Sequence, residues 1–240
     1  MPLVRAAARV LPTVIVANSK TTLQTLPTTR SGRVVTNAVI NDSVSALREA
    51  GRIDRPPVRV GIVGRLSPWK GQDVFLEAFA EAFAGEPDVE AWVIGNAMFG
   101  EDEYADSLQG LASSLGIADR VVFRGFRADV WAEMAELDLL VHCSVIPEPF
   151  GQVVVEGLAA GIPVIAAAAG GPAEVITDMV DGVLTPPGDH HALATAMRRL
   201  HDDPALRSRL TRAGRETAAR YTPEKTAGQI LDIYRQVVTV

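Results

Sequence analysis

Apolar runs separated by glycine and proline organise the segment Leu137–Ala169. The runs Leu139–Cys143 and Pro163–Ala167 carry Val, Ile, Leu and Ala in near-continuous order, which is typical of strands buried on both faces. Between them, an apolar stretch that ends at Gly161 predicts a helix beginning near Gly151. A strand, loop, helix and strand in this order imply a parallel sheet with a right-handed crossover.

The same alternation of strands and helices extends through residues 58–222. The apolar runs VRVGIVG, AWVIGNA, RVVFRG and GVLTP predict four more strands. Helices are predicted at Asp73–Ala84, Glu103–Leu115, Asp129–Glu136, Gly171–Ile176, His191–His201, Ala205–Tyr221 and Glu224–Val238. Alternation of this kind indicates an α/β fold with a doubly wound parallel sheet, Rossmann-like in type.

The first part of the chain is too short to bury two-sided strands by itself. It predicts a short helix over residues 2–11, strands at Thr13–Ala17 and Arg33–Thr36, and a helix at Lys20–Leu26 that Ser19 caps. The stretch Arg52–Pro57 has the composition of a linker. We therefore expect residues 1–45 to be the tail of a second domain, and an unpaired edge there to favour self-association.

Composition narrows the classes of function. The chain has 240 residues, 48% of them hydrophobic, and a net charge of −6, which argues against nucleic-acid binding as a main role. Its single cysteine, Cys143, ends an apolar run and is expected to be a reduced, buried thiol. No apolar run reaches 18 residues, so we expect no membrane-spanning helix and a cytoplasmic protein.

Polar chemistry gathers where the helix after Leu139–Cys143 begins. Gly151 allows close backbone approach, and the free N–H groups of Gln152 and Val153 form an anion site at a helix start. Glu148 and Glu156 place carboxylates beside it. Phosphate-binding amides next to hydroxyl-binding carboxylates suit a nucleotide sugar, although a Pro-Gly loop is often only a tight turn.

The loop Gly64–Gly71 supplies cations at the end of the preceding strand. Arg65 and Lys70 bracket Ser67-Pro68-Trp69, and an arginine fork with a lysine point charge suits a diphosphate. The loop contains neither G-x-G-x-x-G nor a Walker motif, so a dinucleotide or P-loop site is excluded. The alternative is that both residues are ordinary surface charges.

Glu148-Pro-Phe-Gly with Glu156 resembles the Glu-x7-Glu signature of retaining glycosyltransferases of family 4, which have the GT-B fold. The loop Gly-Arg-Leu…Lys-Gly resembles the same family's donor motif. The resemblance implies that residues 1–45 are a remnant of the N-terminal acceptor domain, 46–57 a linker, 58–222 the nucleotide-sugar donor-binding domain and 223–240 a C-terminal crossover helix. One departure is Gly157, where the family often has alanine; glycine costs about 1 kcal/mol of helix propensity.

The resemblance also implies roles for individual residues. Glu148, Arg65 and Lys70 would be catalytic. Donor-binding residues would be Gly64, Phe126, Arg127, Phe150, Gly151, Gln152, Val153 and Glu156. For Phe126 and Arg127, which would line the nucleobase pocket, the alternative is a core phenylalanine and a solvated arginine.

The implied activity is transfer of a sugar from a UDP- or GDP-linked donor, with retention, to an unidentified acceptor. The chain alone would be inactive without the rest of the acceptor domain; the alternatives are a nucleotide-sugar binding module and an epimerase or phosphorylase. A hydrolase using Glu148 and Glu156 fits poorly, because nothing in the sequence raises either pKa. We expect no cofactor and no metal, since His190-His191 has no cysteine or carboxylate cluster nearby in the sequence.

Overall fold

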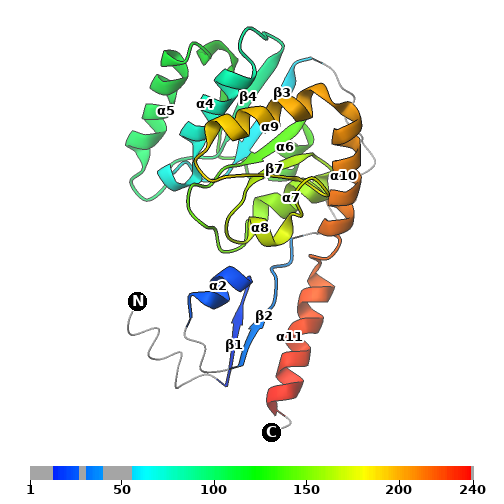
Figure 1. Cartoon of the computed structure of the whole chain (residues 1–240). Helices are drawn as coiled ribbons and strands as arrows, with labels where there is room; N and C mark the ends of the chain where they lie inside the picture. Colours follow the sequence, from blue (N-terminus) through cyan, green and yellow to red (C-terminus); the bar gives the residue numbers. More distant parts are fainter. Residues whose placement is uncertain (1–12, 27–30, 40–55, 239–240) are drawn as a thin grey trace.

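A six-stranded parallel sheet forms the centre of the computed structural model, which describes residues 13–26, 31–39 and 56–238 (Figure 1). The strands lie in the order β5-β4-β3-β6-β7-β8. Their bounds are β3 Val58–Val63, β4 Val89–Ile94, β5 Val121–Gly125, β6 Leu139–His142, β7 Val164–Ala167 and β8 Val183–Thr185. The chain winds outward from β3 to β5, returns to β6 beside β3, and winds outward again. The predicted doubly wound fold is confirmed.

Both faces of this sheet are covered, as the near-continuous apolar runs predicted. In β4, Ala91 and Val93 belong to one buried cluster, whereas Trp92 and Ile94 belong to the other. Successive side chains of a strand point to opposite faces, so a strand between two helical layers is apolar at successive positions along its buried part; Glu90, near the start of β4, is partly exposed. The helices are α4 Gln72–Ala82, α5 Asp102–Ser114, α6 Val130–Ala135, α7 Gln152–Ala160, α8 Pro172–Val175, α9 His190–Asp202 and α10 Pro204–Ala218.

Local chemistry sets where these helices begin. The side chains of Asp189 and Asp203 accept hydrogen bonds from backbone N–H groups in the first turns of α9 and α10, at 2.9 and 2.8 Å. Pro204 occupies the first turn of α10, where its missing N–H costs nothing. Two short 3-10 turns, Pro68–Lys70 and Ala118–Arg120, form where the sequence predicted only loops.

The N-terminal segment forms a small separate unit. Strands β1 (Val14–Ala17) and β2 (Ser31–Val34) pair in parallel, with α2 (Lys20–Gln24) between them. The sequence prediction placed β2 at Arg33–Thr36, two residues too late. The predicted helix over residues 2–11, and most of the predicted linker, lie outside the described residues, and self-association stays a prediction.

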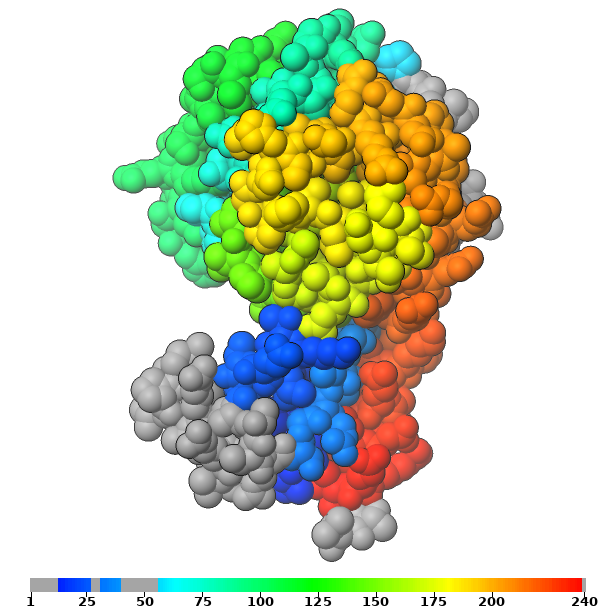
Figure 2. Space-filling model, in the orientation of Figure 1, coloured from blue at the N-terminus to red at the C-terminus, as the bar shows by residue number. Residues whose placement is uncertain are grey.

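Helix α11 (Pro223–Val238) leaves the main unit and lies beside β2, where Thr226 Oγ1 donates to the Thr36 carbonyl oxygen at 3.0 Å (Figure 1). Figure 2 shows the blue surface of the N-terminal unit directly below the yellow surface around α8. None of the helices within the described ranges combines the length and apolar character that crossing a bilayer requires. A cytoplasmic location stays a prediction.

The glycine at position 157 has a packing reason that the sequence did not show. A Cβ there would lie 2.2 Å from Leu140 Cδ2 and 3.0 Å from Val164 Cγ2. Helix α7 therefore lies so close to β6 and β7 that a Cβ here would require the buried side chain of Leu140 to move. Gly110 in α5 is the opposite case, since nothing lies within 4 Å of an added Cβ.

We predict opposite effects of the same substitution at these two helical glycines. Gly110→Ala should raise the free energy of unfolding by up to about 1 kcal/mol, because alanine is the better helix former. Gly157→Ala should lower it by about 1–2 kcal/mol, because overpacking against Leu140 outweighs that gain. Urea unfolding measured by circular dichroism checks both, and a Gly157→Ala protein as stable as the wild type would contradict the packing argument.

Candidate functional site

The loops that follow β3 and β6 meet at the point where the sheet reverses its strand order. In open parallel sheets, ligands bind outside the carboxyl ends of the strands at such a switch point. The loop after β3 carries Arg65 and Lys70, and the loop after β6 carries Glu148. The structure therefore brings the two predicted sources of charge together from segments distant in the sequence.

Lys70 and Glu148 form the contact between these loops. The Lys70 ammonium donates to Glu148 Oε1. Ser144 Oγ donates to the same oxygen at 3.1 Å, and His142 Nε2 lies 2.9 Å from Oε2. An ionised carboxylate can only accept, so His142 carries its proton on Nε2 when it is neutral. Nδ1 of His142 is buried and has no hydrogen-bond partner among the described residues.

Glu148 is only 5% exposed, and two opposed effects act on its pKa. Burial alone would raise the pKa, but the hydrogen bond and charge of His142, with those of Lys70, lower it to about 2 from an ordinary 4.5. The carboxylate is therefore ionised at neutral pH. Of its roughly four lone-pair sites, three are used by these donors, so about one remains for another group.

Buried Gln72 holds the loop that carries both cations. Its side chain donates to the Arg65 carbonyl oxygen at 2.9 Å and accepts from the Ser67 N–H at 3.3 Å. The Arg65 side chain pairs with Glu101, with Nε 3.4 Å from Oε2. The Arg65 guanidinium carbon lies 5.7 Å, and Lys70 Nζ 4.4 Å, from the centre of the Trp69 ring. Both predicted cations therefore lie against one indole ring.

Glycines allow the loops to approach one another closely. Gly71 has a φ of +74°, and a Cβ there would lie 2.3 Å from the Cys143 carbonyl oxygen. The thiol of Cys143, buried as predicted, donates to the Gly71 carbonyl oxygen at 2.9 Å. Gly170 would likewise place a Cβ 2.3 Å from the Glu148 carbonyl oxygen, and these two residues form a backbone bridge. The loop after β7 thus packs directly on the loop that carries Glu148.

The start of α7 has the character of an anion site. Gly151 precedes it in a left-handed conformation (φ +79°), and no side chain caps its first amides, which include those of Gln152 and Val153. Uncapped amides and the positive end of the helix dipole favour a negative ligand.

Glu156 lies one turn further along α7, where Gln152 Nε2 donates to its Oε1 at 2.9 Å. Burial raises the pKa of Glu156. The expectation that nothing raises the pKa of either carboxylate was therefore wrong for Glu156. The correction does not favour a hydrolase, because Lys70, His142 and Ser144 already occupy most of Glu148, so that it is not a free nucleophile.

Three aromatic or cationic candidates lie in different environments. The Phe150 side chain is 4% exposed and its ring packs on Tyr221, with ring centres 5.7 Å apart, so only its backbone could face a ligand. Phe126 is 72% exposed, which rules out the alternative that it is a core residue.

Arg127 is not simply solvated, because its Nε lies 3.1 Å from Glu133 Oε1. Gly64 begins the loop after β3, and its N–H donates to the Ile94 carbonyl oxygen at 3.0 Å.

Glu174 connects the main unit to the N-terminal unit. Its carboxylate accepts from the backbone N–H groups of Lys20 and Thr21, at 2.9 and 2.7 Å, and from the Thr21 hydroxyl at 2.8 Å. Burial slightly opposes ionisation, but these hydrogen bonds lower the pKa of Glu174. The sequence indicated only a helix after Gly170-Gly171; the contact with α2 depends on tertiary structure.

A separate cavity of about 460 Å³ lies at the opposite edge of the sheet. It is lined at the starts of β3, β4 and β6 by Val58, Val89 and Leu139, together with His201 and Arg207. None of the predicted site residues reaches it. We place the functional site at the carboxyl edge because the charged groups and the uncapped helix start gather there.

We predict that Glu148→Gln removes a pH-dependent part of the stability. The pKa of Glu148 is lowered from 4.5 to about 2, so its ionised form stabilises the fold above about pH 4.5, and this contribution is lost as the pH falls toward 2. Removing the charge leaves Lys70 unpaired and should cost about 2–3 kcal/mol of unfolding free energy at pH 7.

Urea unfolding of both proteins between pH 7 and pH 2 measures this difference. It should shrink steadily below pH 4.5. Glu216→Gln, an exposed carboxylate on α10, is the control and should change little. A difference that is the same at all pH values would contradict the assigned pKa.

Known proteins share this fold and these sequence features. A sequence model of the family described as "Glycosyl transferases group 1" matches residues 43–217. The lipopolysaccharide core biosynthesis glycosyltransferase LpsD of Rhizobium meliloti is 36% identical over 168 residues, covering 68% of this chain and 47% of that protein. The D-inositol 3-phosphate glycosyltransferase of Segniliparus rotundus is 32% identical over 197 residues, covering 81% of this chain and 43% of that protein. The chain thus spans slightly under half the length of these curated relatives.

Among solved structures, Anabaena HepE in complex with UDP superimposes with a TM-score of 0.86 at 32% identity, over 98% of this chain and 67% of that one. HepE has also been solved with UDP-glucose, with a TM-score of 0.85. The parallel sheet and its helices therefore match a Rossmann-like half of a GT-B protein. From the matched family and the shared fold, the chain belongs to the group 1 glycosyl transferases.

Proposed function

We propose that this chain is the donor-binding part of a retaining family 4 glycosyltransferase, which takes a sugar from a UDP-linked donor. One observation carries the proposal: Lys70 and Glu148 meet at the switch point of the sheet, beside the uncapped start of α7. A cation and a set of free amides suit the diphosphate of such a donor, which departs as the anionic leaving group, and a carboxylate suits its hydroxyls.

The leaving diphosphate is the part whose charge grows during transfer. Groups that interact more strongly with the transition state than with the ground state are the ones that accelerate the reaction. Lys70 and the amides at Gly151–Val153 would act on that charge. Arg65, which pairs with Glu101 as Lys70 pairs with Glu148, would add a second cation. Preorganised donors of this kind are worth about 3–4 kcal/mol each in barrier height.

The carboxylates would bind hydroxyl groups. Glu148 retains about one free lone-pair site, enough for one hydroxyl of the sugar. Glu156 would accept from the ribose, one helical turn beyond the phosphate site. The exposed ring of Phe126 follows β5 at the same edge of the sheet and would flank the base.

Uracil is the proposed base, because HepE, at 32% identity, was solved with UDP and with UDP-glucose. GDP stays the alternative. No cofactor is proposed for the transfer.

The acceptor site would be formed mostly by an N-terminal domain, of which we propose that residues 1–45 are a small part. The β1–α2–β2 unit is held against α8 by Glu174, and it would form one wall of the acceptor site. We therefore propose that donor binding survives in this chain, whereas turnover needs the remainder of an acceptor domain.

We predict that the chain binds UDP, and that Lys70→Ala weakens binding at least tenfold, since a charge-assisted contact to phosphate is worth about 1.5–3 kcal/mol. Isothermal titration calorimetry with UDP, GDP and their sugars measures this. Arg65→Ala should weaken binding as well, because each cation starts from a pair with one carboxylate, Arg65 with Glu101 and Lys70 with Glu148. Arg212→Ala, an exposed cation on α10, is the matched control and should bind as the wild type does. A folded sample that binds neither nucleotide would reject the proposal.

A further inference from the structure

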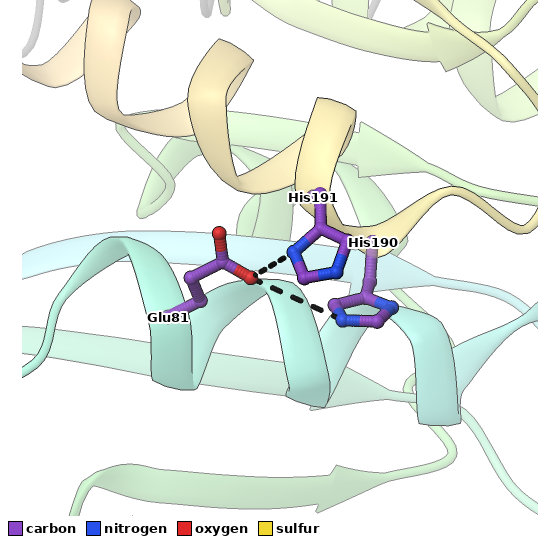
Figure 3. Close-up of side chains that lie close together, drawn as sticks. All are labelled: Glu81, His190 and His191. Carbon is purple, nitrogen blue, oxygen red and sulfur yellow. Dashed lines mark hydrogen bonds and ion pairs between the residues drawn. The ribbon is translucent and has the colours of Figure 1, made fainter.

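Two adjacent histidines at the start of α9 face Glu81 of α4 (Figure 3), and a second glutamate of α4, Glu77, lies beside His190. His191 Nδ1 lies 2.7 Å from Glu81 Oε2, and His190 Nε2 lies 3.9 Å from the same oxygen. The other ring nitrogen of His190, Nδ1, lies 3.5 Å from Glu77 Oε2. No carboxylate cluster lies near this histidine pair in the sequence, but helix packing brings Glu77 and Glu81 to it.

Hydrogen bonds among these four side chains leave a ring nitrogen of His190 that can bind a cation. A neutral imidazole has one N–H and one lone pair. If His190 donates from Nδ1 to Glu77, its Nε2 lone pair faces the Glu81 carboxylate, which has no proton to offer. In that tautomer the Nε2 lone pair of His190 and Glu81 Oε2, 3.9 Å apart, can both act as ligands to a cation bound between them.

We propose that Glu81, His190 and His191 bind a divalent zinc ion. The ligand atoms would be Glu81 Oε2, His190 Nε2 and His191 Nδ1, which all lie within 4.8 Å of one another. Glu77 would hold the His190 ring by accepting its Nδ1–H, the carboxylate–histidine–metal arrangement usual in metal sites. Water would take the fourth position.

The donor set and its spacing suit zinc. Imidazole and carboxylate ligands bind zinc at about 2.0–2.2 Å, which places tetrahedral ligand atoms about 3.3 Å from one another. The spacings of 2.7 and 3.9 Å from Glu81 Oε2 lie on either side of this value. The side chains of His190, His191 and Glu81 are 35%, 73% and 46% exposed, so small rotamer changes and entry of an ion from solvent are both open.

Local charge favours a cation despite the helix start. The amino end of α9 contributes roughly half a positive charge, and that charge opposes a metal ion. Glu77 and Glu81 together offer two negative charges against it, and Asp189 already caps the α9 amides. The balance at the site is therefore negative.

The site lies apart from the donor-binding residues. Lys70 precedes the amino end of α4, whereas Glu81 lies near its carboxyl end. The zinc ion would tie α4 to α9, two helices whose buried residues share one core cluster. The inference is a structural metal clamp, and it does not depend on the proposed activity.

The chain has few other side chains that bind zinc strongly, so the stoichiometry of zinc binding is easy to interpret. The chain has four histidines and one cysteine. His142 and Cys143 are buried, and His201 packs against Phe83, with its Nε2 3.5 Å from Glu86. A stoichiometry near one zinc per chain is therefore expected.

The test is calorimetric titration of the untagged, metal-free chain with ZnCl₂, together with thermal unfolding. We expect one site, and a rise in Tm of about 5–10 °C when free zinc exceeds Kd about a hundredfold. His190→Gln, His191→Gln and Glu81→Gln should each weaken binding at least a hundredfold. Glu77→Gln should weaken it about tenfold, as loss of an outer-shell partner does.

Glu216→Gln is the matched control and should bind zinc as the wild type does. The visible spectrum of bound Co²⁺ gives a second readout, since His190→Gln and His191→Gln should abolish the bands of a low-coordinate site even where they remain folded. Absence of zinc binding to the wild type at millimolar concentration would overturn the proposal. Binding that survives unchanged in His190→Gln, His191→Gln and Glu81→Gln would overturn it equally.

Discussion

The buried ion pair between Lys70 and Glu148 is the interaction on which the site depends. Removing two charges from water is expensive, and a single contact rarely repays that cost. Here His142 and Ser144 supply two further hydrogen bonds to the carboxylate, which keeps it ionised despite 5% exposure. The network holds the ammonium group of Lys70 at the switch point before any ligand arrives. A site built in this way avoids much of the ordering cost that a flexible lysine would add to binding.

Backbone approach makes that network possible. The loops after β3, β6 and β7 lie nearly in contact at Gly71 and Gly170, where a Cβ would overlap a carbonyl oxygen. Gly71 and Gly170 both have positive φ, a region that other residues occupy only with strain. The geometry of the charged groups is therefore set by main-chain packing beneath them. The glycines therefore matter to the site because they allow the loops to approach closely, although they have no functional side chain.

Local patterns predicted most of the fold and the charged members of the site. Strands between two helical layers carry apolar side chains on both faces, so near-continuous apolar runs made β3, β4, β6 and β7 recognisable. Lys70 and Glu148 were recognisable as charged residues beside glycine and proline. The supporting residues were not recognisable in the same way. Gln72 and His142 act because they are buried next to particular atoms, and burial of a polar side chain leaves no periodic signal. For Phe150, the sequence did not show that the ring packs on Tyr221, which leaves only its backbone able to face a ligand. The register of α4 against α9, which joins Glu81 to His191, depends on packing between segments that no sequence window contains.

Helix α4 runs from the candidate donor site, at its amino end, to the proposed zinc site, near its carboxyl end. Its amino end follows Lys70 and is fixed by Gln72 and Gly71, while its carboxyl half packs on α9 through a continuous cluster that includes Phe75, Phe79 and Met197. Energetic coupling between two sites requires an element with two arrangements that both ligands bias. A helix fixed by a dense core along its length offers a single arrangement. An ion held between α4 and α9 would therefore stabilise the folded chain against unfolding while leaving donor affinity nearly unchanged, because both ligands bind the same state of the same rigid unit.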